Sequence, residues 1–112
     1  MSLPHAASGD IIDVRPLGPK LADAVSTALF KTDQLEAMRL VLTTGKEIPE
    51  HHVAGDFTLH CIEGKVELRV NADVRTLQAG EMVFVAAEAP YSIRALADAS
   101  LLMTLARCRE GG

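Results

Sequence analysis

The sequence predicts an all-β fold, with short strands closed into a small barrel or packed as a sandwich. From Gly45 onward, runs of apolar and β-branched residues alternate with turns that contain Gly, Pro, Asn or Asp. These turns recur about every eight to twelve residues, a spacing that is typical of such folds. The chain has 112 residues, of which 48% are hydrophobic. That is enough apolar material for one domain with its own core.

Residues 1–25 are expected to form an N-terminal arm, because prolines and glycines interrupt regular structure there. Within the arm we expect one strand segment at residues 11–14 and a short helical turn at residues 21–25. Ile11 and Ile12 need burial, which a subunit interface would provide.

The segment that follows the arm carries conflicting signals. Its Ala, Leu, Glu and Met residues favour a helix, and helix or strand stays open for residues 21–31. In residues 35–43, however, apolar side chains alternate between two faces, and residues 32–34 suit a turn. We therefore favour two antiparallel strands, at residues 26–31 and 35–43.

The remaining strands complete a barrel that we place at residues 26–108, with a flexible tail at residues 109–112. They are expected at residues 57–62, 66–70, 74–77, 82–85, 91–96 and 101–107.

Composition excludes several classes of function. The net charge is −4 and no Lys/Arg cluster appears, so we expect no nucleic-acid partner. No apolar run approaches the roughly 20 residues of a membrane span, so we expect no membrane segment. Residues 1–5 have neither a basic start nor a following apolar block like a secretion signal, so we expect a cytoplasmic location. Cys61 and Cys108 lie far apart and form no CxxC pair, which favours reduced thiols.

Two segments resemble a known family. Residues 45–64 have Gly45, His51 and Gly64 at the spacing of the first cupin motif, and residues 80–91 resemble the second motif through Gly80 and the Pro90-Tyr91 pair. The fifteen residues between Gly64 and Gly80 match the short spacer of small bacterial cupins. The resemblance implies a double-stranded β-helix, the jelly-roll barrel of the cupin (RmlC-like) superfamily.

The resemblance also implies where a metal would bind, since cupins hold it with two histidines and a glutamate of motif one and a histidine of motif two. One of these four positions still carries its metal-binding side chain, that of His51. The other three positions are occupied by Val53, Phe57 and Tyr91. Hydrocarbon side chains cannot ligate a metal. We therefore expect no cofactor, with a divalent transition metal as the alternative.

The other histidines are weak candidates for metal ligands. His51 and His52 are neighbours, and neighbouring side chains of a strand point to opposite faces, so they share an ion only where a bulge turns them together. The same alternation separates His60 from Cys61: it predicts a buried Cys61 and places His60 at a second sheet or subunit interface. Asp56 is expected in a turn rather than as a ligand.

Inward-facing side chains are expected to line a ligand pocket inside the barrel, with Arg39, Arg94 and Glu50 near its mouth. His51 and Tyr91 are the best catalytic candidates, because an imidazole base facing a phenol can transfer protons without a metal. The simpler interpretation is a hydrogen-bonded pair that lines the pocket. The expected pocket residues are Met38, His51, Val53, Phe57, Leu59, Tyr91 and Met103.

Three hypotheses for function follow. The preferred one is a module that binds a small, partly apolar molecule in the barrel cavity. The alternative is an enzyme, which is either metal-dependent through His51 with His52 or His60, or a metal-free isomerase or lyase that uses His51 and Tyr91. In the third, side chains fill the cavity and the protein acts through its dimer surface. Small barrels expose sheet edges, and we expect a homodimer that uses the arm.

Overall fold

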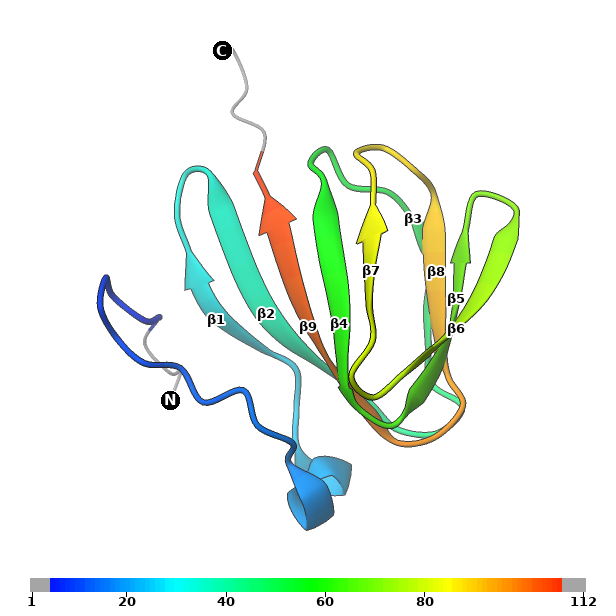
Figure 1. Ribbon diagram of the computed structural model, residues 1–112, viewed down its shortest axis with the longest axis horizontal. Helices are drawn as coiled ribbons and strands as arrows, with labels where there is room; N and C mark the ends of the chain where they lie inside the picture. Colours follow the sequence, from blue (N-terminus) through cyan, green and yellow to red (C-terminus); the bar gives the residue numbers. More distant parts are fainter. Residues whose placement is uncertain (1–4, 108–112) are drawn as a thin grey trace.

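The computed structural model describes residues 5–107, which form nine strands and one short 3₁₀ helix (Figure 1). The helix η1 spans Gly18–Asp23, and the strands are β1 (Thr27–Lys31), β2 (Leu35–Leu42), β3 (Glu47–His51), β4 (Phe57–Glu63), β5 (Lys65–Val70), β6 (Asp73–Gln78), β7 (Met82–Val85), β8 (Tyr91–Ala95) and β9 (Ala99–Ala106). The large sheet has the order β1-β2-β9-β4-β7 and the small sheet the order β3-β8-β5-β6. This arrangement confirms the predicted all-β jelly roll.

Alternation of apolar side chains sets the register of both sheets. In β2, Met38 and Leu40 pack against the core, while Ala37 and Arg39 point to the outer face of the large sheet. β2 pairs antiparallel with β1 and with β9, and its Met38 lies opposite Met103 of β9. The strand interpretation of residues 35–43 is therefore confirmed. Residues 21–31, for which helix or strand was left open, contain both a helical part and a strand, since η1 ends at Asp23 and β1 begins at Thr27.

The core lies between the two sheets. Phe57, Leu59 and Cys61 of β4 are 2%, 0% and 0% exposed, whereas the intervening Thr58 and His60 are only half-buried. Cys61 is thus a core residue, as predicted. The cluster between the sheets also contains Leu42, Val66, Leu68, Leu77, Val85, Tyr91, Ile93, Ala95, Ala99, Leu101 and Met103.

Gly64 forms the tight turn between β4 and β5 that brings the end of the first motif against β9. Its φ is +85°, which favours glycine, and a Cβ at this position would lie 2.6 Å from Cα of Ala99. The first motif's closing glycine is therefore required by both conformation and space.

β3 was not predicted as a strand. It carries Pro49 and is mostly exposed, so its sequence lacks the apolar alternation that identifies the other strands. β3 lies at the edge of the small sheet and, among the described strands, pairs with β8 alone, a position that tolerates proline.

The N-terminal arm runs beside the outer face of the large sheet and η1 lies below it (Figure 1). Residues 11–14, where we expected a strand segment, form no strand, and Ile11 is 98% exposed. The arm is held instead by side chains of the sheet, because the guanidinium of Arg39 donates to the carbonyl oxygens of Asp13 and Arg15. Among residues 5–107, no helix is long and apolar enough to cross a membrane. Cys108 and the expected tail at 109–112 lie outside the described residues.

Candidate functional site

Three of the four positions that the cupin motifs assign to metal ligands meet at one end of the barrel. His51 is the last residue of β3, Tyr91 is the first of β8, and the two are paired across the small sheet. Phe57 begins β4 in the large sheet, and its ring centroid lies 4.8 Å from that of Tyr91. The fourth position, Val53, is half-buried and packs against the same core. The residues at the four motif positions therefore lie together at one site.

His51 and Tyr91 form a hydrogen-bonded pair at this end of the barrel. The Tyr91 hydroxyl lies 3.0 Å from Nε2 of His51, and the ring centroids are 4.7 Å apart. Nδ1 of His51 lies 3.2 Å from the carbonyl oxygen of Pro49, which only a protonated Nδ1 can use as an acceptor. This geometry favours the tautomer in which Nε2 accepts a hydrogen bond from the phenol.

The two members of the pair differ in exposure. Tyr91 is 4% exposed, and its burial raises the pKa of the phenol above its usual value of 10.0. The phenol therefore remains protonated at neutral pH and acts as a donor. His51 is exposed, so the imidazole is the part of the pair that a dissolved molecule meets first.

The predicted pocket residues divide into a packed interior and an accessible end. Leu59 and Met103 are 0% and 5% exposed and lie opposite each other on β4 and β9, and Met38 packs against them from β2. A cavity of about 190 Å³ lies beside Val53, between residues 53–55 and the end of β9. This cavity lies at the end of the barrel where His51 lies, and of the predicted pocket residues Val53 alone lines it.

The residues present do not fit a cupin metal centre. The positions of a second histidine and of the glutamate carry the hydrocarbon side chains of Val53 and Phe57, and Nε2 of His51 already accepts from Tyr91. Within the described part of the chain, no three His, Cys, Asp or Glu side chains gather where they could hold an ion. The remaining donor set offers one imidazole and one protonated phenol, which is a poor ligand set for a divalent cation.

The other predicted histidine candidates lie elsewhere. His52 is exposed, and its Nε2 lies 3.5 Å from the carboxylate of Glu88. His60 is half-buried on the outer face of β4, opposite Met82 of β7 and Leu102 of β9. Within residues 5–107, neither imidazole forms a hydrogen bond or a ring contact with the pair of His51 and Tyr91.

Asp56 joins the two motifs and directly precedes β4, after a bend at residues 54 and 55. Its carboxylate accepts from the N–H of Ala87 at 2.8 Å, and its carbonyl oxygen accepts from the N–H of Ala106, also at 2.8 Å. The N–H of Glu88 in turn donates to the carbonyl oxygen of Val53 at 2.8 Å. These bonds fix the loops that surround the candidate site.

Arg39 was expected near the mouth of the barrel, and this expectation was wrong. The side chain is 6% exposed and lies on the outer face of the large sheet, beneath the arm. The sequence could have predicted this position, because side chains alternate along a strand. Arg39 must therefore face away from the cavity that its neighbours Met38 and Leu40 face. Sequence reasoning also missed Glu63 and Ser100, which lie beside the arm and are joined by a hydrogen bond of 2.6 Å.

Comparison with known proteins supports the fold. No protein-family model matches the sequence, and no curated protein matches it significantly. Among solved structures, a cupin superfamily protein from Desulfitobacterium hafniense superposes with a TM-score of 0.76 and 17% identity, over 92% of this chain and 100% of that chain. An RmlC-like cupin from Shewanella frigidimarina gives a TM-score of 0.72 and 19% identity, over 96% and 95% of the two chains.

A conserved protein of unknown function from Streptococcus pyogenes is also similar, with a TM-score of 0.74 and 17% identity over 96% of each chain. The chain therefore has the fold of a small cupin-type domain. At these identities the likeness defines the fold, and the function must be argued from the site.

Proposed function

We propose that the protein binds a small, partly apolar molecule at the end of the barrel marked by His51 and Tyr91. The observation that carries the proposal is the hydrogen bond of 3.0 Å between the Tyr91 hydroxyl and Nε2 of His51, at the edge of an otherwise apolar interior. Binding sites for small molecules commonly combine apolar walls with a few fixed polar groups that orient the ligand. A cavity of about 190 Å³ lies at the same end of the barrel, lined by residues 53–55 and 105–107, and a ligand held there would have to extend from it to reach the pair.

The experiment is a fragment screen by two-dimensional NMR with small alcohols, phenols and carbonyl compounds. We expect ligands to shift the signals of residues 51–53 and 91, and Tyr91→Phe to weaken binding about tenfold or less, because it removes one hydroxyl. His51→Ala should weaken binding further. A screen in which no compound shifts these residues, or in which the variants bind as the wild type does, would contradict the proposal.

A metal-free enzyme is the second candidate, favoured by the same contact. An imidazole with its lone pair at Nε2 and a phenol that stays protonated are a base and an acid within hydrogen-bond reach. Exchange of carbon-bound hydrogen in α-hydroxy ketones dissolved in D₂O would reveal proton transfer. Exchange that persists in His51→Ala would reject this candidate.

We further propose that the protein is a cytoplasmic homodimer. On the outer face of the large sheet, Met82 and Phe84 of β7 are 65% and 64% exposed, and Ile11 of the arm is 98% exposed. Such apolar side chains favour burial against a second copy. Light scattering should give twice the chain mass for the wild type and the chain mass for Phe84→Glu, and a monomeric wild type would reject the dimer. Within residues 5–107 Cys61 is a buried residue without a disulfide, which suits a reducing compartment.

A further inference from the structure

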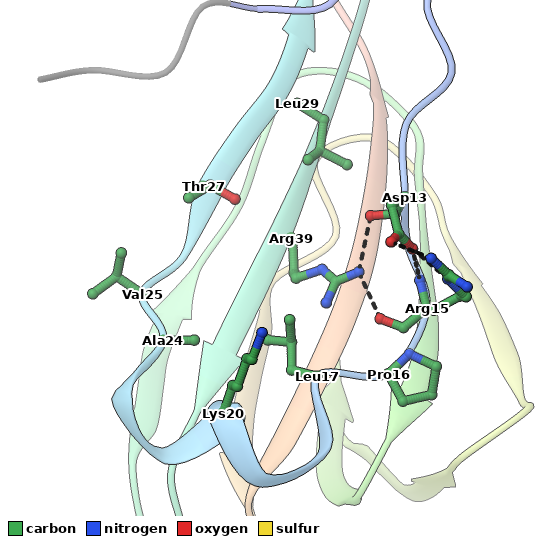
Figure 2. A pocket seen from close by; sticks show the side chains of 10 residues that line it. All are labelled: Asp13, Arg15, Pro16, Leu17, Lys20, Ala24, Val25, Thr27, Leu29 and Arg39. Atoms are coloured by element: carbon green, nitrogen blue, oxygen red, sulfur yellow. Dashed lines mark hydrogen bonds and ion pairs between the residues drawn. The ribbon is translucent and has the colours of Figure 1, made fainter.

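A second cavity lies on the other side of the large sheet, between the N-terminal arm and the outer faces of β1 and β2 (Figure 2). Its volume is about 690 Å³, which is within the range of small-molecule sites. Three cations line it, namely Arg15 and Lys20 from the arm and η1 and Arg39 from β2. Asp13 lines it as well, so positive charge exceeds negative charge.

Arg39 is the buried member of this cationic set. It is 6% exposed, and its Nη2 donates to the carbonyl oxygens of Asp13 and Arg15 at 3.4 and 3.0 Å. Its Nη1 is buried and has no hydrogen-bond partner among residues 5–107. A buried charged donor without an acceptor is costly, because the nitrogen has lost its water and gained nothing in return. Arg39 lines the cavity, so an acceptor for this nitrogen would be a ligand held there.

The neighbouring carboxylates already accept hydrogen bonds from groups other than Arg39. Asp13 accepts from Nε and Nη2 of Arg15 at 3.0 and 2.9 Å. Glu63 accepts from the N–H groups of Leu17 and Gly18 at 2.7 and 3.0 Å. Both carboxylates lie near enough to Arg39 to feel its charge, but neither forms an ion pair with it within the described residues. The charges of Arg39 and Lys20 remain open to an anion.

Apolar side chains form the other half of the cavity wall. Leu17, Val25 and Leu29 lie around Arg39 in Figure 2, and Val25 is 73% exposed. An inorganic anion would leave these walls in water, whereas a carboxylate with a short hydrocarbon chain would bury them. We propose that this cavity binds a small organic carboxylate, with its head on Arg39 and Lys20 and its chain against Leu17, Val25 and Leu29.

The test uses hexanoate as the probe, with uncharged hexanamide and inorganic phosphate as comparisons, titrated into the full chain and followed by NMR. Hexanoate should shift the amide signals of residues 15, 17, 18, 20 and 39 in a saturable manner. Hexanamide should bind about tenfold more weakly, because it lacks the charge that strengthens hydrogen bonds to a guanidinium. Equal binding of hexanamide would overturn the role of the cations, and equal binding of phosphate would overturn the role of the apolar walls.

Variants locate the site. Lys20→Met and Arg39→Met should each weaken hexanoate binding about tenfold, by loss of one charge-assisted contact. Lys46→Met, which removes an exposed lysine outside the cavity, should leave binding unchanged. If Arg39→Met releases the arm, the result for Lys20→Met still tests the proposal, because the Lys20 side chain is exposed. Unchanged binding in Lys20→Met would overturn the proposal, and so would hexanoate shifts confined to residues 51–53 and 91, which would assign the ligand to the barrel site.

Discussion

Glu88 occupies a backbone conformation that suits glycine. Its φ is +67°, in the left-handed region that residues with a Cβ rarely adopt. It lies in the loop between β7 and β8, at the position where the second cupin motif has glycine. Its N–H is bonded to Val53, so the loop cannot relax without breaking the link between the motifs. A hydrogen bond between the two motif segments thus holds Glu88 in its left-handed conformation.

We predict that Glu88→Gly raises the free energy of unfolding by about 0.5–1 kcal/mol, because glycine removes the steric cost of the left-handed conformation. Urea denaturation at neutral pH measures the change. Asn71→Gly is the matched control, since Asn71 has a φ of +55° but asparagine tolerates this region well, so a smaller gain is expected. A destabilised Glu88→Gly would mean that the contact of Glu88 with His52 outweighs the strain.

Single residues show what the sequence could and could not predict about the sites. His51 and Tyr91 were paired correctly, because motif spacing fixes their places on two strands whatever their side chains are. The cavity under the arm was missed, because nothing in the sequence states that residues 13–20 return to cover Arg39. Contacts between distant segments of irregular chain have no local pattern.

At the scale of elements, Glu63 joins the arm to the sheet. At the end of β4 it receives hydrogen bonds from Leu17, Gly18 and Ser100. Burial opposes its ionisation, but these hydrogen bonds outweigh burial and hold the pKa of the carboxyl below its usual value of 4.5. The ionised carboxylate of Glu63 therefore binds the arm to the large sheet.

A pH dependence follows from this lowered pKa. The contribution of Glu63 to the free energy of unfolding is fully present above about pH 4.5 and is lost as the pH falls through the lower pKa of the folded state. We predict that Glu63→Gln lowers stability at pH 7 by about 1–3 kcal/mol and that the gap to the wild type narrows below pH 4.5. Urea denaturation at several pH values measures both. Glu50→Gln, at an exposed position, should show no such gap; a gap of constant size for Glu63→Gln would refute the linkage.

The strands differed in how well the sequence predicted them. β4, β5 and β9 have apolar residues on alternate positions and were predicted within two residues at each end. β3 has no such pattern, because an edge strand with exposed side chains buries little and is held by backbone pairing with β8. Long-range pairing, rather than local propensity, makes it a strand.

At the scale of the whole molecule, the large sheet separates two candidate sites. Its inner face packs against the small sheet, whose strands β3 and β8 carry His51 and Tyr91, while its outer face carries Arg39 and the arm. Strand alternation produces this division, since neighbouring residues of β2 serve opposite faces. A ligand in either site can therefore bind without touching the other.

The same architecture predicts that a metal site can be restored. His51, Val53, Phe57 and Tyr91 come from separate strands and loops, and three of them are in ring contact, so the barrel still brings the ligand positions together. The triple variant Val53→His, Phe57→Glu and Tyr91→His should bind about one equivalent of Co²⁺, detected by its visible absorption, with a rise in melting temperature on metal addition.

Without metal this variant should be less stable than the wild type by several kcal/mol, on the order of 3–5, because Phe57 fills the core and a buried carboxylate replaces it. Adding His51→Ala to the triple variant is the matched control, and it should abolish tight Co²⁺ binding while leaving the same core defect. Equal Co²⁺ binding by the two variants would show that the ion is held elsewhere and that the motif positions do not form one centre. Tight binding that depends on His51 would show that the barrel retains the geometry of a metal-binding cupin, and that three side-chain replacements separate this chain from one.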